Sequence, residues 1–192
     1  MTRTRQLAPR ERILAAADDL FRRLGTSVGV EQIAAEADTN KMTLYRHFES
    51  KDQLIAEWMR GIIAEKDAAW NEIAAAHPGD ACAQLVSWSE RIAAALAQMG
   101  ERGSPILCAL VELPDPDHPA RRVIDEHRRH DHERLIALCR EAGFPEPEVT
   151  GDELYFLLEG AKSCVQCVGL KRVGEHLMRQ VATMVATHGR RN

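Results

Sequence analysis

The sequence predicts an all-α protein, with a three-helix head at the amino-terminal end and a larger helical domain after it. Apolar residues recur at spacings of three and four along most of the chain, which is the period of a helix with one buried face. Clusters of glycine and proline interrupt this pattern, and no segment alternates apolar and polar residues as a half-buried strand would. We therefore expect about nine helices, divided between residues 9–60 and residues 61–192.

Composition limits the classes of protein to which the chain can belong. Hydrophobic residues make up 45% and charged residues 28%, as in a globular protein that dissolves in water. There is no apolar run of about 18 residues and no signal-peptide core, so we expect neither membrane insertion nor export. The five cysteines are an odd number without the spacing of a disulfide framework, which indicates a reducing cytoplasm.

The distribution of charge bears on nucleic-acid binding. A net charge of −4 argues against a protein that coats nucleic acid with a broad basic surface. Residues 1–60 carry ten Lys/Arg and nine Asp/Glu, whereas residues 61–192 carry fifteen and twenty. The first ten residues contain three arginines and no acid. A basic arm on a nearly neutral head fits local phosphate contacts.

The first expected helix begins at Pro9, because proline suits a first helical position, and it ends before Gly25. Its apolar stripe predicts that one face is buried against the next two helices. The expected core of this head is Leu20, Phe21, Ile33, Leu44 and Phe48.

A second and a third short helix, joined by a sharp turn, are expected next. The second has four apolar residues on one face between Val30 and Ala37. Asp38 follows, a residue type that tolerates the left-handed backbone conformation of a turn. Thr39 or Asn40 can then cap the third helix by accepting a bond from its free N–H groups.

The third helix has an unusual outward face. Leu44 and Phe48 share its inner side, so a cation, a thioether, a hydroxyl and a phenol are left outside. These groups suit phosphates and base edges. Two helices joined by a tight turn form the helix-turn-helix geometry, which lays the second helix into the major groove. We place the motif at about residues 32–51.

The head also carries a spaced set of residues: Phe21, Gly25, Ile33, Ala34, Ala37, the run Thr43-Leu44-Tyr45-Arg46-His47-Phe48, Ser50, Lys51 and Leu54. This set resembles the DNA-binding domain of tetracycline-repressor-type (TetR-family) regulators over roughly residues 9 to 60. The remainder of the chain is similar to the family only in layout and length.

Several positions depart from the pattern of the family. It usually has Gly, Val, Ser and a second Gly where this chain has Asp38, Thr39, Asn40 and Met42. It usually begins the second helix with paired hydroxyls, where this chain has Val28 and Gly29. Met42 therefore predicts an individual base preference.

A long helix from Lys51 to about Ala76 is expected after the head, because Ser50 and Gln53 form a capping box at its start. Proline and glycine clusters separate the helices that follow. We expect these at residues 81–99, 106–113, 119–142, 150–168 and 171–187.

The resemblance implies a dimeric DNA-binding repressor, which a small-molecule effector releases from double-stranded operator DNA. The sequence shows no Ser/His/Asp order, phosphate-binding glycine loop or catalytic pair of carboxylates, so we expect no enzyme, cofactor, catalytic residue or metal site. For base edges and the groove we select Lys41, Met42, Thr43 and Tyr45. For phosphates we select Arg46, His47 and Lys51, assisted by Arg3, Arg5 and Arg10.

Two further sets of residues are expected in residues 61–192. An apolar ligand pocket with a few polar anchors would be lined by Trp88, Met99, Leu107, Leu110, Val111, His127, Asp131, Tyr155 and Glu159. The last two helices would pair across a two-fold axis as a four-helix bundle, as in the family. They would use Leu157, Gly160, Ala161, Cys164, Cys167, Val173, Leu177, Val181, Met184 and Val185.

Two alternatives stay open at this point. Cys164 and Cys167 have the spacing of a redox motif, although they lie in a helix with no strand before it, so a thiol-sensing regulator competes with simple helix packing. His127 and Asp131 share a helix face and could bind a metal or belong to an enzyme, although the sequence identifies no third ligand. A solvated, charge-rich helix face is the competing interpretation of that stretch.

Overall fold

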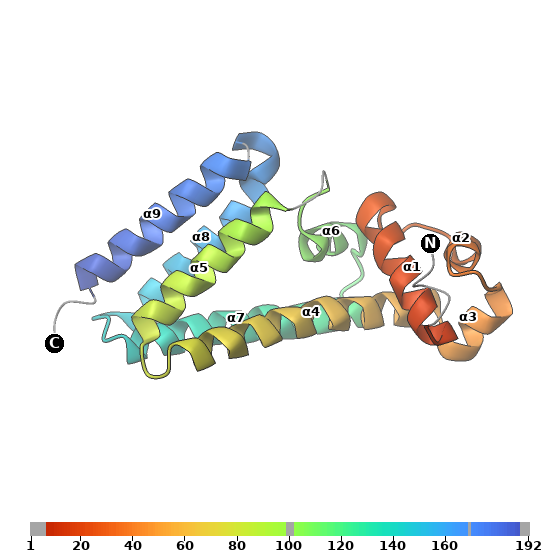
Figure 1. Cartoon of the computed structure of the whole chain (residues 1–192), viewed down its shortest axis with the longest axis horizontal. Coiled ribbons are helices and arrows are strands. Elements are labelled where there is room, and N and C mark those ends of the chain that lie inside the picture. The colour runs from red at the N-terminus through yellow and green to blue at the C-terminus, as the bar shows by residue number, and fades with distance from the viewer. Residues whose placement is uncertain (1–6, 99–101, 169, 189–192) are drawn as a thin grey trace. The chain divides into compact units, whose positions relative to one another are not determined.

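The computed structural model describes the backbone of residues 7–98, 102–168 and 170–188, and the side chains of these ranges except 165–168, 170, 171 and 188. The described chain forms nine helices and no strand, which confirms the predicted all-α fold (Figure 1). The helices are α1 (Pro9–Leu24), α2 (Val30–Glu36), α3 (Lys41–His47), α4 (Lys51–Ala76), α5 (Ala81–Ala97), α6 (Pro105–Glu112), α7 (Pro119–Glu141), α8 (Pro147–Val168) and α9 (Leu170–His188).

Most helix ends lie within two residues of their predicted positions, and the start of α8 is the exception. We expected this helix to begin near Thr150, but its first residue is Pro147. The prediction treated the proline as a break. At a first helical position, however, the missing N–H of proline is not needed, and its fixed φ already suits a helix.

The helices fold into two compact units, and each is described by itself. The first contains residues 1–64 together with residues 105–125. Its core joins the inner faces of α1, α2, α3 and the first half of α4 to apolar residues of α6 and the start of α7. Thr26 donates from its N and Oγ1 to the Glu112 carboxylate, at 2.6 and 2.8 Å. The compact unit is therefore larger than the head that we expected at residues 9–60.

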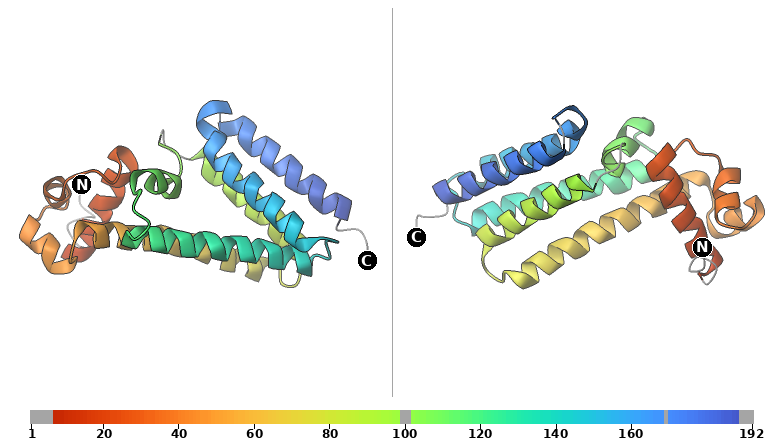
Figure 2. Two further views of the ribbon diagram at one scale, coloured as in Figure 1. Left: turned by 180° about the vertical axis from the view of Figure 1, so that it is seen from behind. Right: turned by 45° about the horizontal axis from the view of Figure 1, so that its top comes forward.

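The second unit contains residues 65–104 and 126–192. Helices α5, α8 and α9 lie side by side in it, as Figure 2 shows, and α9 contacts both of the others. Gly151 allows a close approach of α8 to α7, because a Cβ at this position would lie 2.5 Å from the Cγ1 of Ile136. Trp70 and Trp88 stack in the core with their ring centroids 3.8 Å apart. No helix within the described ranges has both the length and the apolar character needed to cross a membrane.

Candidate nucleic-acid interface

The turn between α2 and α3 has the geometry that the sequence predicts. Asp38 adopts a positive φ of 49°. The Thr39 N–H donates to the carbonyl of Ala34 at 2.9 Å, which closes the carboxyl end of α2. Asn40 is the residue that caps α3, because its Oδ1 accepts a bond from the Thr43 N–H at 2.9 Å. Both helix ends are therefore fixed by hydrogen bonds within the ten residues from Ala34 to Thr43, and the angle between the helices is set locally.

Helix α3 is held by its inner side and presents the predicted polar side to solvent. Leu44 is fully buried and Phe48, just beyond the helix, is nearly so. Met42 is 75% exposed and Tyr45 is 42% exposed, although both are large side chains with apolar surface. Exposed apolar surface gathered in one place often marks a site of contact, so this face is suited to binding another molecule. Lys41, Arg46 and His47 are exposed on the same helix, and Thr43 is partly exposed.

Glu31 on α2 is a neighbour of this face that the sequence did not reveal. Its carboxylate lies 2.6 Å from the Nζ of Lys41, and both side chains are solvent-exposed. The hydrogen bond lowers the pKa of Glu31 and raises the pKa of Lys41. An exposed pair of this kind contributes little stability, so a DNA phosphate or base edge can compete for the lysine. The pairing depends on the angle of the turn, which explains why helix patterns could not show it.

The residues selected for phosphate contacts differ in their surroundings. Lys51 begins α4 and is half-buried, and burial lowers its pKa. It stands where the free N–H groups of a 26-residue helix favour an anion. Arg10 lies over the ring of Phe48 and 2.7 Å from Glu57, so these two groups already hold its guanidinium. Arg3 and Arg5 lie outside the described residues.

Only some of the residues selected for a ligand pocket lie in the same compact unit. Trp88, His127, Asp131, Tyr155 and Glu159 all belong to the second unit, and the first three are buried there. Leu107, Leu110 and Val111 belong to the first unit, and Val111 is 82% exposed. Met99 lies outside the described residues.

The residues selected for a dimer interface divide between inside and outside. Val173, Leu177 and Val181 of α9 lie in the core of the second unit, together with Ala161 of α8. Assigning them to a surface between chains was wrong, because helices of the same chain already cover them. Gly160 and Cys164 face open space or solvent, while Leu157, Met184 and Val185 are partly exposed. The side chain of Cys167 is outside the described set. Phe156, which the sequence reading missed, is 69% exposed on α8.

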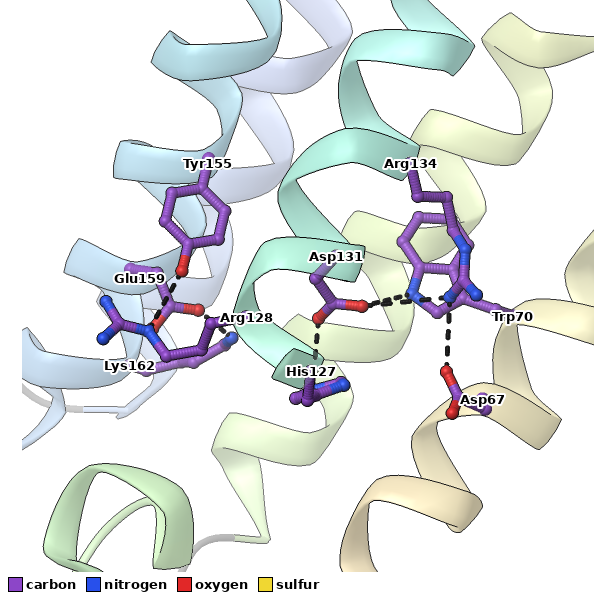
Figure 3. A network of polar contacts seen from close by, with 9 residues as sticks. All are labelled: Asp67, Trp70, His127, Arg128, Asp131, Arg134, Tyr155, Glu159 and Lys162. Carbon is purple, nitrogen blue, oxygen red and sulfur yellow. Dashed lines mark hydrogen bonds and ion pairs between the residues drawn. The ribbon is translucent and has the colours of Figure 1, made fainter. Parts of the chain in front are cut away.

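The surroundings of His127 bear on the metal alternative. Its Nε2 lies 3.4 Å from the Oδ2 of Asp131. Within the described part of the chain, no three His, Cys, Asp or Glu side chains converge as metal ligands would. The geometry there is that of a buried imidazole next to a carboxylate (Figure 3).

Two of three comparisons relate the chain to known proteins. Residues 13–58 match the family model described as "Bacterial regulatory proteins, tetR family". No curated protein sequence matches the chain significantly. Among solved structures, a TetR-family transcriptional regulator from Streptomyces coelicolor is 28% identical, with a TM-score of 0.88 over 94% of this chain and 96% of that one. A putative TetR transcriptional regulator from Streptomyces avermitilis is 24% identical, with a TM-score of 0.78 over 95% and 98% of the two chains.

Proposed function

The chain belongs to the tetR family of bacterial regulatory proteins, and we propose on that premise that it is a dimeric repressor which a small-molecule effector releases from its operator. Membership in the family makes it a DNA-binding regulator of transcription. Repression, dimer formation and release by an effector are what we propose beyond membership in the family.

The observation that carries the proposal is the outward face of α3. A cation, a thioether and a phenol stand together on a short helix whose inner side is locked by Leu44. Such a helix can enter the major groove and place polar and apolar groups against base edges. Lys41, Met42, Thr43 and Tyr45 would read bases, and Arg46, His47 and Lys51 would contact phosphates.

One head of this size makes few base contacts, so specific binding calls for two heads on two half-sites. A two-fold dimer supplies them, and the exposed apolar residues of α8 are the surface that we assign to it. An effector then releases the operator only to the extent that it binds the released state more tightly. A tenfold loss of DNA affinity corresponds to a difference of about 1.4 kcal/mol.

The test separates base readout from phosphate contact. Operator fragments would first be selected from genomic DNA by gel shift, and binding then measured for Lys41→Ala, Tyr45→Phe and Lys51→Ala. We expect the first two to lose about 1–3 kcal/mol on the operator and to change base preference. Lys51→Ala should weaken binding to operator and random DNA alike and reduce the salt dependence, because a phosphate contact carries no sequence information.

Arg91→Ala is the matched control, since it removes an exposed cation from α5 in the second unit. It should bind like the wild type. Equal losses on operator and random DNA for all three head variants would show that α3 does not read bases. Absence of DNA binding by the wild type at low salt would overturn the proposed function itself.

A further inference from the structure

Glu31 and Lys41 form an ion pair between α2 and α3, the two helices of the helix-turn-helix. The Oε1 of Glu31 lies 2.6 Å from the Nζ of Lys41, and the two side chains are 68% and 54% exposed. Helices α2 and α3 contact each other within the first unit (Figure 1). The pair therefore brings an acidic group to the face that we assign to the major groove.

The Glu31 carboxylate is held from two sides. Its Oε1 accepts the hydrogen bond from Lys41. Its Oε2 lies back toward Gly29, the residue that precedes α2, since a Cβ added at Gly29 would be 3.6 Å from this oxygen. The bond from Lys41, followed by the backbone N–H of Glu31 itself, lowers the pKa of the carboxyl group. Glu31 is therefore ionised at neutral pH, and its side chain is folded against the start of its own helix.

The carboxylate limits what Lys41 can bind on DNA. A lysine without a partner pairs with any phosphate that its long side chain reaches, and such a contact carries no sequence information. If Lys41 moved to a phosphate, Glu31 would face the polyanion unpaired, at an interface from which DNA has displaced water. Lys41 has three donors, so it can keep Glu31 as one acceptor and still donate to a base edge. The base that lysine contacts most often is guanine, through O6 and N7.

We propose that Glu31 is a positioning residue that directs Lys41 to a guanine edge and keeps it away from phosphates. The inference rests on the proposed function, because it requires α3 to lie in the major groove. The pair has no net charge, so Lys41 contributes little to sequence-independent binding in the wild type. Removing the carboxylate frees the lysine for a phosphate, which strengthens binding to any DNA and weakens discrimination between sequences.

The experiment measures DNA binding by the full-length protein over a range of salt concentrations. The probes are the operator fragment selected from genomic DNA, its single-base-pair variants and a random duplex of the same length. The variants are Glu31→Gln, which keeps the shape and removes the charge, Lys41→Ala, and the two combined. Glu36→Gln is the matched control, because it removes the same charge from the exposed last residue of α2. Thermal unfolding of Glu31→Gln should match the wild type, since an exposed ion pair contributes little stability.

Glu31→Gln should bind random DNA more tightly than the wild type does. Its slope of log K against log salt concentration should be steeper by about 0.9, as one additional phosphate contact requires. The ratio of operator affinity to random affinity should fall at least about fivefold, and the lost discrimination should lie at the base pair that Lys41→Ala also affects. In the Lys41→Ala background, Glu31→Gln should leave this ratio unchanged. Glu36→Gln should keep the wild-type ratio.

An unchanged ratio and salt slope for Glu31→Gln would overturn the inference, and a wild type that binds its operator would leave the proposed function standing. An equal fall of the ratio with and without Lys41 would also overturn it, because Glu31 would then act on the DNA directly, as a carboxylate does when it accepts from cytosine N4. A wild type that binds no DNA at low salt would overturn the proposed function itself, so the two failures are distinguishable.

Discussion

Lys66 lowers the stability of the folded protein, because its ammonium group is partly buried. Burial removes its ammonium group from water and Lys162 repels it, and the nearby carboxylates of Asp131, Glu159 and Asp67 offset only part of this, so the pKa of Lys66 falls. The lowered pKa expresses this cost, since the folded protein holds the proton less tightly than the unfolded chain does.

Replacing Lys66 should therefore stabilise the protein at neutral pH. The folded pKa of about 8 lies below the ordinary value of 10.5, so between these values the unfolded chain keeps a proton that the folded protein has lost. Wild-type stability gains from this difference as pH rises through the window, and the full cost is present below pH 8. Thermal unfolding should show Lys66→Met more stable than the wild type at pH 7, with the gap closing toward pH 10.

Arg91→Met, the exposed control, should change little at any pH. A stability difference between Lys66→Met and the wild type that stays constant from pH 7 to 10 would show that the ammonium charge is not its cause and would indicate a packing effect.

At the scale of an element, α3 is a short helix whose position depends on its cap. A seven-residue helix has little stability of its own, and packing of Leu44 and the bond from Thr43 to Asn40 hold it in place. Asn40→Ala should lower the free energy of unfolding by about 1 kcal/mol, which chemical denaturation can measure. It should weaken operator binding as well, because the amino-terminal end of α3 carries Lys41 and Met42.

Asn71→Ala is the matched control, because Asn71 is exposed inside α4 and caps nothing in the described structure. Alanine favours a helix interior, so this variant should be as stable as the wild type or slightly more so. If the two asparagine variants lose the same stability, the cap on α3 is not what holds it.

Helix periodicity predicted the elements well and their partners poorly. The stripe Val173, Leu177 and Val181 correctly indicated a buried face on α9, but a stripe does not say which surface covers it. The structure places it against the core of the same chain, where α5 lies, rather than on a second copy. The pairing of Lys41 with Glu31 was hidden for a related reason, since it depends on how two helices are angled. Lys66 could have been noticed from its spacing to Trp70, although only the structure shows that it is half-buried.

At the scale of the whole molecule, the dimer that we propose would use the apolar surface that α8 leaves exposed. Val149 and Phe156 are 51% and 69% exposed on this helix, and Gly160 has open space where a side chain would be. A large exposed aromatic group beside a bare stretch of backbone suits the close approach of another helix. We therefore propose Phe156, rather than the buried valines of α9, as the centre of the dimer interface.

Phe156→Glu should give a monomer, because two carboxylates would face each other near the two-fold axis. Sedimentation measures the change in mass. A gel shift should show weakened operator binding, because the two DNA-binding heads are no longer joined in one dimer. Val111→Glu is the control, since it places the same charge at an 82% exposed apolar residue of the first unit. An undisturbed dimer for Phe156→Glu would remove α8 from the interface.

The first unit is assembled from two separated stretches of chain, and this bears on how such proteins can be recombined. Residues 105–125 supply Ile106, Ala109 and Ile124 to its core and the Glu112 acceptor for Thr26. A gene fragment that ends after residue 64 would leave that core open on one side. Transplanting this head onto the body of another regulator therefore requires three crossover points: one within α4, one before α6 and one within α7. A chimera with only the first crossover should express poorly or aggregate, whereas one that also carries residues 105–125 should stay in solution.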